Sequence, residues 1–190
     1  MRHSILVCLL ALLYSQCTQE VIRCKIETTL GDIEVELYPE KAPTTVANFL
    51  NYTDAGLYTN SSFFRACTPA NEADRAIQIE VIQGGNVPEE KEMEPIQIET
   101  TKQTGLLHQH GTLSMARDKP NSATCSFFIC LGDQPSLDFG GARNPDGFGF
   151  AAFGRVTQGM EVVLEIQKQK EEGQYFIEPV PILRIVRINE

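Results

Sequence analysis

Two histidines that lie two residues apart, His108 and His110, are the first side chains in the sequence that could do chemistry. On a strand, residues two apart share a face, so both imidazoles could reach one metal ion. The sequence indicates no third ligand near them, and two solvated imidazoles in a loop are the favoured interpretation. Ser114 and Ser126 have no evident base and no G-x-S-x-G turn, so a nucleophilic serine is not indicated. What remains is a set of apolar residues with one arginine and one glutamine.

Other common cofactor motifs are missing from the sequence. A Walker loop and a G-x-G-x-x-G fingerprint are both absent, which leaves nucleotide binding without support. The glycine-rich segment 140–147 is predicted to be a long surface turn. No C-x-x-C occurs, so neither a zinc ribbon nor a thioredoxin-type redox centre is indicated. We therefore predict a protein that uses no metal and no cofactor.

The composition is typical of one acidic globular domain. The 190 residues include 16 Lys and Arg and 25 Asp and Glu, which gives a formal net charge of −9, and 42% are hydrophobic. A chain of this length forms roughly one domain with a sizeable core. Nucleic-acid binding is not expected, because a backbone binder needs a basic face that displaces counterions from phosphates. Nothing in the sequence indicates an oligomer, and we expect a monomer.

The first 17 residues are predicted to be a signal peptide or a lipoprotein-type leader. A short basic stretch, 1–3, precedes an unbroken apolar run, 5–13. That run is too short for a bilayer core of ~30 Å but suits a secretory signal, and a buried first strand is the alternative. Cys17 leaves a lipid anchor open, although Gln16 fits a lipobox poorly. We expect an exported protein, periplasmic or secreted, with its mature domain over residues 20–190.

Four cysteines fall in the mature domain, and disulfides persist outside the cytosol. They are Cys24, Cys67, Cys125 and Cys130. The odd separation of Cys125 and Cys130 places them on opposite faces of a strand, where they cannot bridge. We expect buried free thiols, and a Cys24–Cys67 bridge is the remaining alternative.

The elements that position these residues are mostly strands. Ile33, Val35 and Leu37 alternate with acidic residues, the pattern of a half-buried strand. Further strand candidates are 21–28, 62–65, 77–83, 96–100, 111–116, 126–131, 151–156 and 182–188.

Two segments have helical spacing instead. Pro43 opens the first helix, Phe49 lies on its apolar stripe, and Gly56 closes it. The second helix covers about 160–166 and stops before Gly173. Eight or nine short strands with two helices predict a mainly β protein, a closed antiparallel barrel plugged by helices.

Several blocks of the sequence resemble successive signature blocks of the cyclophilins. In chain order they are 42–50 (APTTVANFL), 63–65 (FFR), 81–86 (VIQGGN), 111–117 (GTLSMAR), 120–122 (PNS), 126–131 (SFFICL), 137–138 (LD) and 151–156 (AAFGRV). The resemblance covers about residues 20–190. Within the family, the chain resembles exported bacterial-type cyclophilins. It implies a closed eight-stranded antiparallel barrel capped by two α-helices. It also implies peptidyl-prolyl cis/trans isomerase activity without a cofactor.

The same resemblance implies a role for individual residues. Arg65 matches the arginine that stabilises the twisted amide, and Gln83 matches the glutamine that contacts the substrate backbone and orients the arginine. Phe128 matches the aromatic base of the proline pocket. The remaining residues that match substrate-binding positions are Met115, Ala116, Arg117, Leu137, Phe150 and Val81.

The sequence also departs from the family pattern. Glu80 and Val81 stand where a phenylalanine and a methionine usually wall the pocket, and 70–75 reads as a loop insertion. The chain has no tryptophan, and Ser136 stands where many members use one to bind cyclosporin, so weak cyclosporin binding is expected.

The function that the resemblance implies is acceleration of X-Pro rotation in exported or folding proteins, with proline-containing peptides and unfolded proteins as partners. The alternative is a proline-peptide-binding module or chaperone of the same fold with little turnover. A cell-surface scaffold is a third possibility, and nothing outside the predicted barrel supports it.

Overall fold

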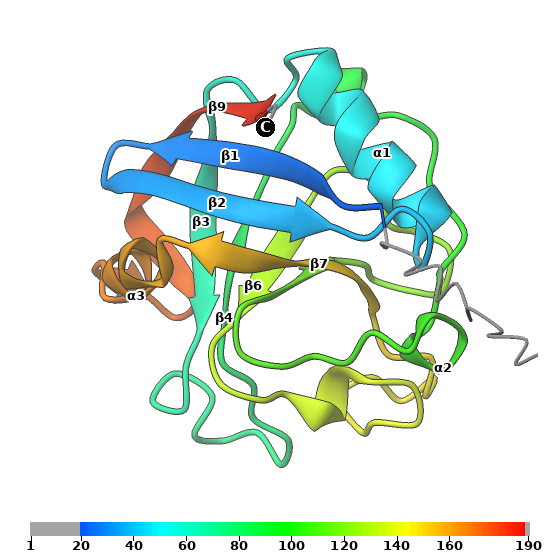
Figure 1. Ribbon diagram of the computed structural model, residues 1–190. Coiled ribbons are helices and arrows are strands. Elements are labelled where there is room, and N and C mark those ends of the chain that lie inside the picture. Colours follow the sequence, from blue (N-terminus) through cyan, green and yellow to red (C-terminus); the bar gives the residue numbers. More distant parts are fainter. Residues whose placement is uncertain (1–19, 189–190) are drawn as a thin grey trace, which may run out of the picture.

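The strands of the computed structural model, which describes residues 20–188, form a closed barrel (Figure 1). They are β1 (Ile22–Thr28), β2 (Gly31–Leu37), β3 (Ser61–Cys67), β4 (Val81–Gly84), β5 (Thr112–Met115), β6 (Phe127–Cys130), β7 (Ala151–Gln158), β8 (Glu171–Glu172) and β9 (Tyr175–Arg187). The ring runs β1-β2-β7-β5-β6-β4-β3-β9 and closes through a β1–β9 pairing. Each pairing is antiparallel, and the short β8 pairs with β9 outside the ring. The predicted eight-stranded antiparallel barrel is therefore confirmed.

The first hairpin shows why alternating sequence makes this sheet. Cys24 and Ile26 of β1 lie opposite Val35 and Ile33 of β2, and these side chains are fully buried in the barrel. Directly opposed residues of an antiparallel pair point to the same face, so the intervening residues face outward. Gly31 starts β2 with φ +135, and a Cβ there would lie 2.8 Å from a methyl of Val162. Only glycine suits both demands at this turn.

Three α-helices lie within the described residues, α1 (Pro43–Asp54), α2 (Thr101–Thr104) and α3 (Met160–Gln167). Figure 1 shows α1 and α3 on opposite sides of the barrel. They are the two helices that the sequence predicts, and Pro43 occupies the first turn of α1, where its missing N–H is not needed. The sequence missed α2, a single turn that begins after Thr100 and ends at Gly105 with φ +71.

Two strand predictions need correction. Residues 96–100 form no strand, and only an isolated bridge joins Ile96 to Ala123. The backbone N–H of Ile98 donates to the side chain of Asn121, so this segment pairs with a loop instead of a strand. The predicted strand 77–83 begins only at Val81, because the residues before it belong to the loop that connects β3 to β4.

Aromatic side chains fill the barrel under α1. Phe49 of α1 packs with ring centroids 5.3 Å from Tyr58, 5.4 Å from Phe127 and 5.3 Å from Phe153. The buried Tyr58 hydroxyl donates to the Cys125 carbonyl at 2.8 Å, so its polar end is satisfied. These contacts fix α1 on the barrel and tie it to the segment that leads into β6.

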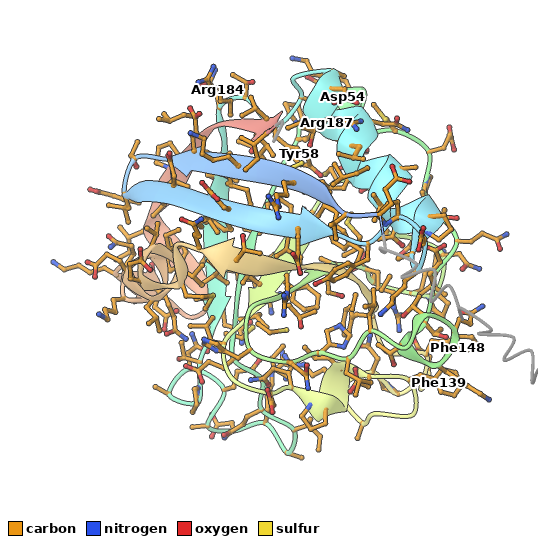
Figure 2. The ribbon with its side chains drawn as sticks, viewed as in Figure 1. Asp54, Tyr58, Phe139, Phe148, Arg184 and Arg187 are labelled. Atoms are coloured by element: carbon orange, nitrogen blue, oxygen red, sulfur yellow. The ribbon has the colours of Figure 1, made fainter. Side chains whose placement is uncertain are left out.

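An ion pair joins the far end of this helix to the last strand. The Arg187 guanidinium contacts both carboxylate oxygens of Asp54, with Nε to Oδ1 at 2.8 Å (Figure 2). The hydrogen bond from Arg187 holds the pKa of Asp54 below its usual value. Because both side chains are partly exposed, the pair contributes little to stability, about 0–1 kcal/mol.

The four cysteines of the described range are buried free thiols, as predicted, and the alternative Cys24–Cys67 bridge is absent. Burial raises the pKa of Cys24 to about 12 and that of Cys67 to about 11. The predicted leader, 1–17, and the candidate lipid anchor at Cys17 lie outside the described residues. Between residues 20 and 188, no helix has the length and apolar character needed to cross a membrane.

Candidate active site

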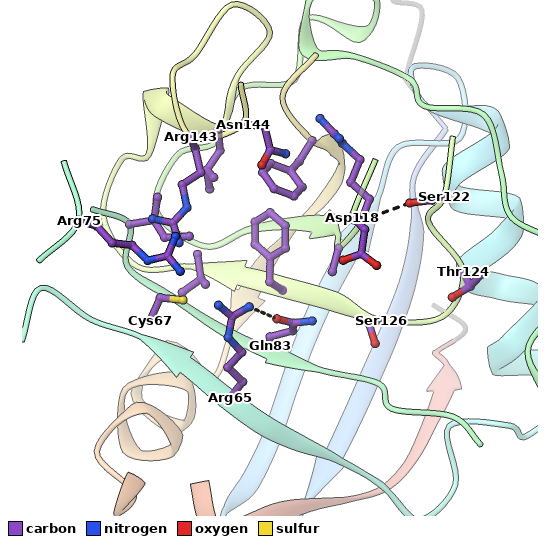
Figure 3. Close-up of a pocket in the computed structure, with 17 residues that line it drawn as sticks. Arg65, Cys67, Arg75, Gln83, Asp118, Ser122, Thr124, Ser126, Arg143 and Asn144 are labelled. Carbon is purple, nitrogen blue, oxygen red and sulfur yellow. Dashed lines mark hydrogen bonds between the residues drawn. The ribbon is translucent and has the colours of Figure 1, made fainter. Parts of the chain in front are cut away.

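A second, smaller apolar cluster lies apart from the barrel core and forms the base of a pocket. Its buried members are Cys67, Ile79, Val81, Phe128, Cys130 and Leu137, with Ala116 and Phe150 packed against them. The pocket above this cluster has a volume of about 370 Å³ (Figure 3). Phe150 meets the Phe128 ring edge-on, with ring centroids 5.4 Å apart. The floor of the pocket is therefore apolar.

Three neighbouring strands bring the predicted catalytic residues together. Arg65 of β3 lies opposite Gln83 of β4, and Gln83 lies opposite Phe128 of β6. Opposed residues share a face of the sheet, so three side chains far apart in sequence meet on the outer face of the barrel. Arg65 Nη1 donates to Gln83 Oε1 at 3.0 Å, a contact drawn in Figure 3.

Gln174 is a further partner of Arg65. It lies in the turn between β8 and β9, and its Oε1 accepts from Arg65 Nε at 3.1 Å and also from Nη2. A register shift between Phe63 and Arg65 in β3 accompanies this contact. Such a bulge redirects a side chain locally. Nothing in the sequence pattern marked Gln174, because its approach depends on the packing of a distant turn.

Eight of the nine predicted site residues line the pocket. They are Arg65, Val81, Gln83, Ala116, Arg117, Phe128, Leu137 and Phe150. Met115 is the exception, because its side chain belongs to the barrel core. Met115 lies opposite Phe127, which faces the interior, whereas Ser114 lies opposite Phe128 on the pocket face. The alternation of faces along β5 therefore places Met115 away from the pocket that the other eight residues line.

The Arg117 side chain forms part of the pocket wall, but its charge is already matched. Its guanidinium contacts both carboxylate oxygens of Asp146, at 2.7 and 2.9 Å, and Nε donates to the Gly149 carbonyl at 2.8 Å. The hydrogen bond from Arg117 lowers the pKa of Asp146. The guanidinium also lies 5.2 Å from the centroid of the Phe150 ring. Arg117 thus braces Phe150 and differs from Arg65, whose partners are neutral amides.

The structure explains how Glu80 and Val81, the two departures from the family pattern, fit at the pocket wall. Ile79 and Val81 both face the pocket, while Glu80 between them points away, and its carboxylate accepts from Gln167 Nε2 of α3 at 2.8 Å. Alternation along an extended chain places residues 79 and 81 on one face. The wall is therefore apolar despite Glu80, and Ile79 is a pocket residue that the sequence analysis missed.

His108 is not the solvated imidazole that the sequence predicts. It is 1% exposed, with Nδ1 2.8 Å from Asp138 Oδ1 and Nε2 2.9 Å from Ser114 Oγ. The order Asp-His-Ser matches a hydrolase triad, but Ser114 is 0% exposed and does not line the pocket. No substrate carbonyl can reach that hydroxyl, so the arrangement supports the floor instead of attacking a substrate.

His110, in contrast, is exposed as predicted, and its Nδ1 accepts from the Gly132 N–H at 2.9 Å. Among residues 20–188, no group of three or more His, Cys, Asp or Glu side chains is placed to hold a metal ion.

Comparison with known proteins identifies the class to which this fold and pocket belong. The family model described as cyclophilin type peptidyl-prolyl cis-trans isomerase/CLD matches residues 23–187. The chain therefore belongs to the cyclophilin-type peptidyl-prolyl cis-trans isomerases, and it is an enzyme of X-Pro bond rotation.

Individual relatives agree with this assignment. The chain is similar to peptidyl-prolyl cis-trans isomerase B of Escherichia coli, 38% identical over 145 residues, 74% of this chain and 80% of the relative. It is 35% identical over 167 residues to the isomerase cyp18 of Streptomyces antibioticus, 85% of this chain and 93% of the relative.

Solved structures show the same fold. A crystal structure of a cyclophilin-type isomerase of Cryptosporidium parvum superposes with a TM-score of 0.73 at 24% identity, covering 90% of this chain and 99% of that chain. A second structure of that protein, in the presence of the dipeptide Ala-Pro, gives a TM-score of 0.70 at 23% identity and covers 88% and 99% of the two chains.

Proposed function

We propose that this isomerase holds a substrate proline on the Phe128 floor and stabilises the twisted X-Pro amide with the Arg65 guanidinium. The observation that carries the proposal is the direct register of Arg65, Gln83 and Phe128 across β3, β4 and β6. That register places a cation, a hydrogen-bonding amide and an apolar floor on one face within one pocket. The Ala-Pro dipeptide in the related Cryptosporidium structure supports a proline-containing substrate.

The chemistry needs no bond cleavage. Rotation about a peptide bond has a barrier of about 18–20 kcal/mol, because amide resonance is lost in the twisted state. A twisted amide has a pyramidal nitrogen with an available lone pair, which an N–H donor can approach. A catalyst therefore accelerates rotation by binding the twisted amide more strongly than either planar form. Among residues 20–188, three N–H groups of Arg65 donate to Gln83 and Gln174, which leaves its other N–H groups for the substrate.

The pocket is chemically different at its two ends. Ser122, Thr124, Ser126 and Asp118 line one end, and Arg65 lies toward the other (Figure 3). Phe128 lines the same pocket, so a proline on the floor has polar groups available for the flanking peptide backbone. Apolar walls near the proline strengthen the field of Arg65, because charge is screened less than in water.

A protease-coupled isomerisation assay on a short proline peptide tests this mechanism, with Arg65→Ala as the variant. Loss of one pre-organised charged donor is expected to lower kcat/KM by roughly 10²-fold or more. Arg155→Ala is a matched control, since Arg155 is an exposed arginine that pairs with Glu36 on another part of the barrel. Unchanged turnover in Arg65→Ala would remove Arg65 from the mechanism. No turnover in the folded wild type would favour a proline-peptide-binding module or chaperone.

We also propose a cellular location for this isomerase. The basic and apolar pattern of residues 1–17 supports export to a periplasmic or extracellular location, with a lipid anchor at Cys17 as a variant of that route. Expression of the full chain and mass analysis of the exported product would test this, and an intact N-terminus in the cytosol would contradict it.

We also propose that the protein is a monomer and that it binds cyclosporin weakly. The weak cyclosporin binding is supported by the absence of tryptophan from the chain, with Ser136 at the position where many members of the family have one. Isothermal titration would contradict this proposal if it gave sub-micromolar affinity, and sedimentation would contradict the monomer if it gave a larger mass.

A further inference from the structure

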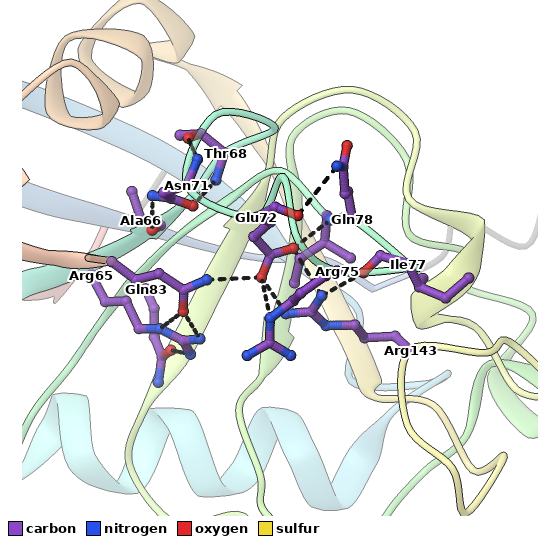
Figure 4. A network of polar contacts seen from close by, with 12 residues as sticks. Arg65, Ala66, Thr68, Asn71, Glu72, Arg75, Ile77, Gln78, Gln83 and Arg143 are labelled. Atoms are coloured by element: carbon purple, nitrogen blue, oxygen red, sulfur yellow. Dashed lines mark hydrogen bonds and ion pairs between the residues drawn. The ribbon is translucent and has the colours of Figure 1, made fainter.

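The loop between β3 and β4 inserts a buried carboxylate behind the catalytic arginine. Glu72 has a side chain that is 0% exposed. Its Oε2 accepts from Arg143 Nη1 at 2.8 Å and from the Ile79 N–H at 2.9 Å, and its Oε1 accepts from Arg143 Nη2 and from Gln174 Nε2 at 2.9 Å (Figure 4). The sequence marked this stretch only as an insertion. The structure shows that Glu72 joins this stretch to Arg143 of the glycine-rich segment and to Gln174.

Glu72 determines which end of the Gln174 amide faces Arg65. A carboxylate accepts hydrogen bonds and does not donate them, so it binds the NH₂ end of the amide. The oxygen end is then directed to Arg65, where it accepts from Nε and Nη2. The reversed amide would place NH₂ donors against a guanidinium, which has only donors. The Glu72–Gln174–Arg65 chain is therefore directional.

This chain orients Arg65 without forming an ion pair with it. The charge of Glu72 is matched by the two-point contact from Arg143. Arg75 approaches the same carboxylate at 3.5 Å and is mostly exposed. Within residues 20–188, the hydrogen-bond acceptors that meet the Arg65 guanidinium are the amide oxygens of Gln83 and Gln174. Arg65 thus keeps a full positive charge toward the pocket.

Glu72 remains ionised at neutral pH. Burial by itself raises the pKa of this carboxyl group, but the hydrogen bonds from Arg143 and from the Ile79 N–H outweigh burial and hold the pKa below its usual value of 4.5. The carboxylate can therefore act as a permanent acceptor for Gln174 under the conditions in which the enzyme works.

We propose that Glu72 is a positioning residue of the isomerase, which aims Arg65 at the proline pocket through the neutral amide of Gln174. The inference rests on the proposed role of Arg65 in catalysis. It assigns a role to Glu72, whose own side chain does not line the pocket. Arg143, from the glycine-rich segment, then serves to balance the buried charge and to join the two loops, since its Nη1 also donates to the Ile77 carbonyl at 2.7 Å.

Two substitutions test the chain at different points. Gln174→Met keeps the length of the side chain but removes both hydrogen-bonding ends, and Glu72→Gln removes the charge that selects the amide orientation. Gln169→Met is the matched control, because Gln169 Nε2 donates to the Glu165 carbonyl at 3.0 Å in an exposed setting and takes no part in the Glu72–Gln174–Arg65 chain. If Glu72→Gln fails to fold, Gln174→Met still decides the question, since it leaves the Glu72–Arg143 pair intact.

The first readout is turnover with kcat and KM separated. Misorientation of Arg65 is expected to lower kcat roughly tenfold while KM changes less than about twofold, because the proline floor is untouched. The control is expected to match the wild type. A kcat for Gln174→Met within about twofold of the wild type would overturn the proposal.

The second readout is the Nε–Hε resonance of Arg65 in a ¹H–¹⁵N NMR spectrum of the folded protein. Arg117 is the internal reference, since its Nε–H donates to the Gly149 carbonyl at 2.8 Å and lies outside the chain of contacts. Both variants are expected to speed solvent exchange at Arg65 and leave Arg117 unchanged. Equal broadening of both resonances would indicate general loosening and would overturn the specific role. This readout needs no turnover, so it separates failure of the inference from failure of the proposed function.

Discussion

The imidazole of His108 lies almost parallel to the ring of Phe128, with 5.9 Å between the ring centroids and 15° between the ring planes. Phe150 meets both rings edge-on, at 6.5 Å from His108 and 5.4 Å from Phe128. His108 is held in turn by Asp138 and Ser114. The floor of the pocket therefore rests on a polar side chain whose two nitrogens are both hydrogen-bonded. A satisfied buried network of this kind restricts the rings to one arrangement.

His108→Ala is expected to weaken both the fold and the pocket. It leaves a cavity under Phe128 and removes the imidazole that bonds Ser114 Oγ and Asp138 Oδ1, so we expect the free energy of unfolding to fall by about 3 kcal/mol. The KM for a proline peptide should rise several-fold, because Phe128 loses its support. Denaturant titration and steady-state assays measure the two effects. His110→Ala should stay within about 0.5 kcal/mol of the wild type, since that imidazole is exposed. Equal behaviour of the two variants would contradict a supporting role for His108.

The Glu72–Arg143 pair is expected to make stability depend on acid pH. The pKa of Glu72 is lower in the folded state than its usual 4.5. The stabilisation is therefore complete above about pH 4.5 and is lost as the pH falls through the lower folded-state pKa. At neutral pH, Glu72→Gln should destabilise by roughly 3 kcal/mol, because it leaves Arg143 buried without its counter-charge.

Thermal unfolding at neutral pH and at about pH 3 checks this prediction. The difference in Tm between the wild type and Glu72→Gln should narrow in acid, since protonation removes the same charge from the wild type. A difference that is constant over this pH range would show that the charge of Glu72 does not stabilise the fold.

Gly149→Ala is expected to disturb the pocket wall through the backbone. Gly149 has φ +66, and a Cβ there would lie 2.5 Å from the Leu137 carbonyl oxygen. Since the Gly149 carbonyl also accepts from Arg117, movement here should displace the side chain that braces Phe150. We expect a stability loss of about 2 kcal/mol or more and a raised KM.

Gly147→Ala is the matched control for this substitution. Gly147 has nearly the same backbone, φ +69, but no atom lies within 4 Å of its added Cβ. Gly147→Ala should therefore lower the free energy of unfolding only by the backbone strain, about 1 kcal/mol, and leave KM unchanged. Calorimetry and peptide assays on both variants separate backbone strain from the steric clash of the added Cβ. Equal losses of stability in the two variants would contradict the close approach to Leu137.

Much of the barrel was accessible to prediction, because alternating residues such as Ile33, Val35 and Leu37 carry the period of a strand in the sequence itself. The helix at Pro43 carried its own start signal. Residues 96–100 also alternate, yet they form no strand, since a strand needs a neighbouring chain in register and this segment meets a loop. Local pattern could not distinguish these two situations.

The pocket residues were predicted from a resemblance between ordered motifs, and that method has a clear limit. It could transfer Arg65, Gln83 and Phe128, whose types stand in matching blocks. It could not find Glu72 or Gln174, because both lie in segments that the matching blocks do not cover. It also assigned Met115 to the substrate, when the register of β5 turns that side chain into the core.

The sequence by itself determined the strand and helix periods, the acidic charge and the set of motif residues, because each of these depends on residue type and spacing along the chain. Tertiary structure alone decided that His108 is buried, that Ile79 replaces Glu80 at the wall, and that Glu72 reaches Arg65 through Gln174. The physical reason is that burial and hydrogen-bond partners are set by segments far apart in the chain, such as Arg65 and Gln174, which are 109 residues apart. The local sequence pattern does not show which segments come into contact in the folded protein.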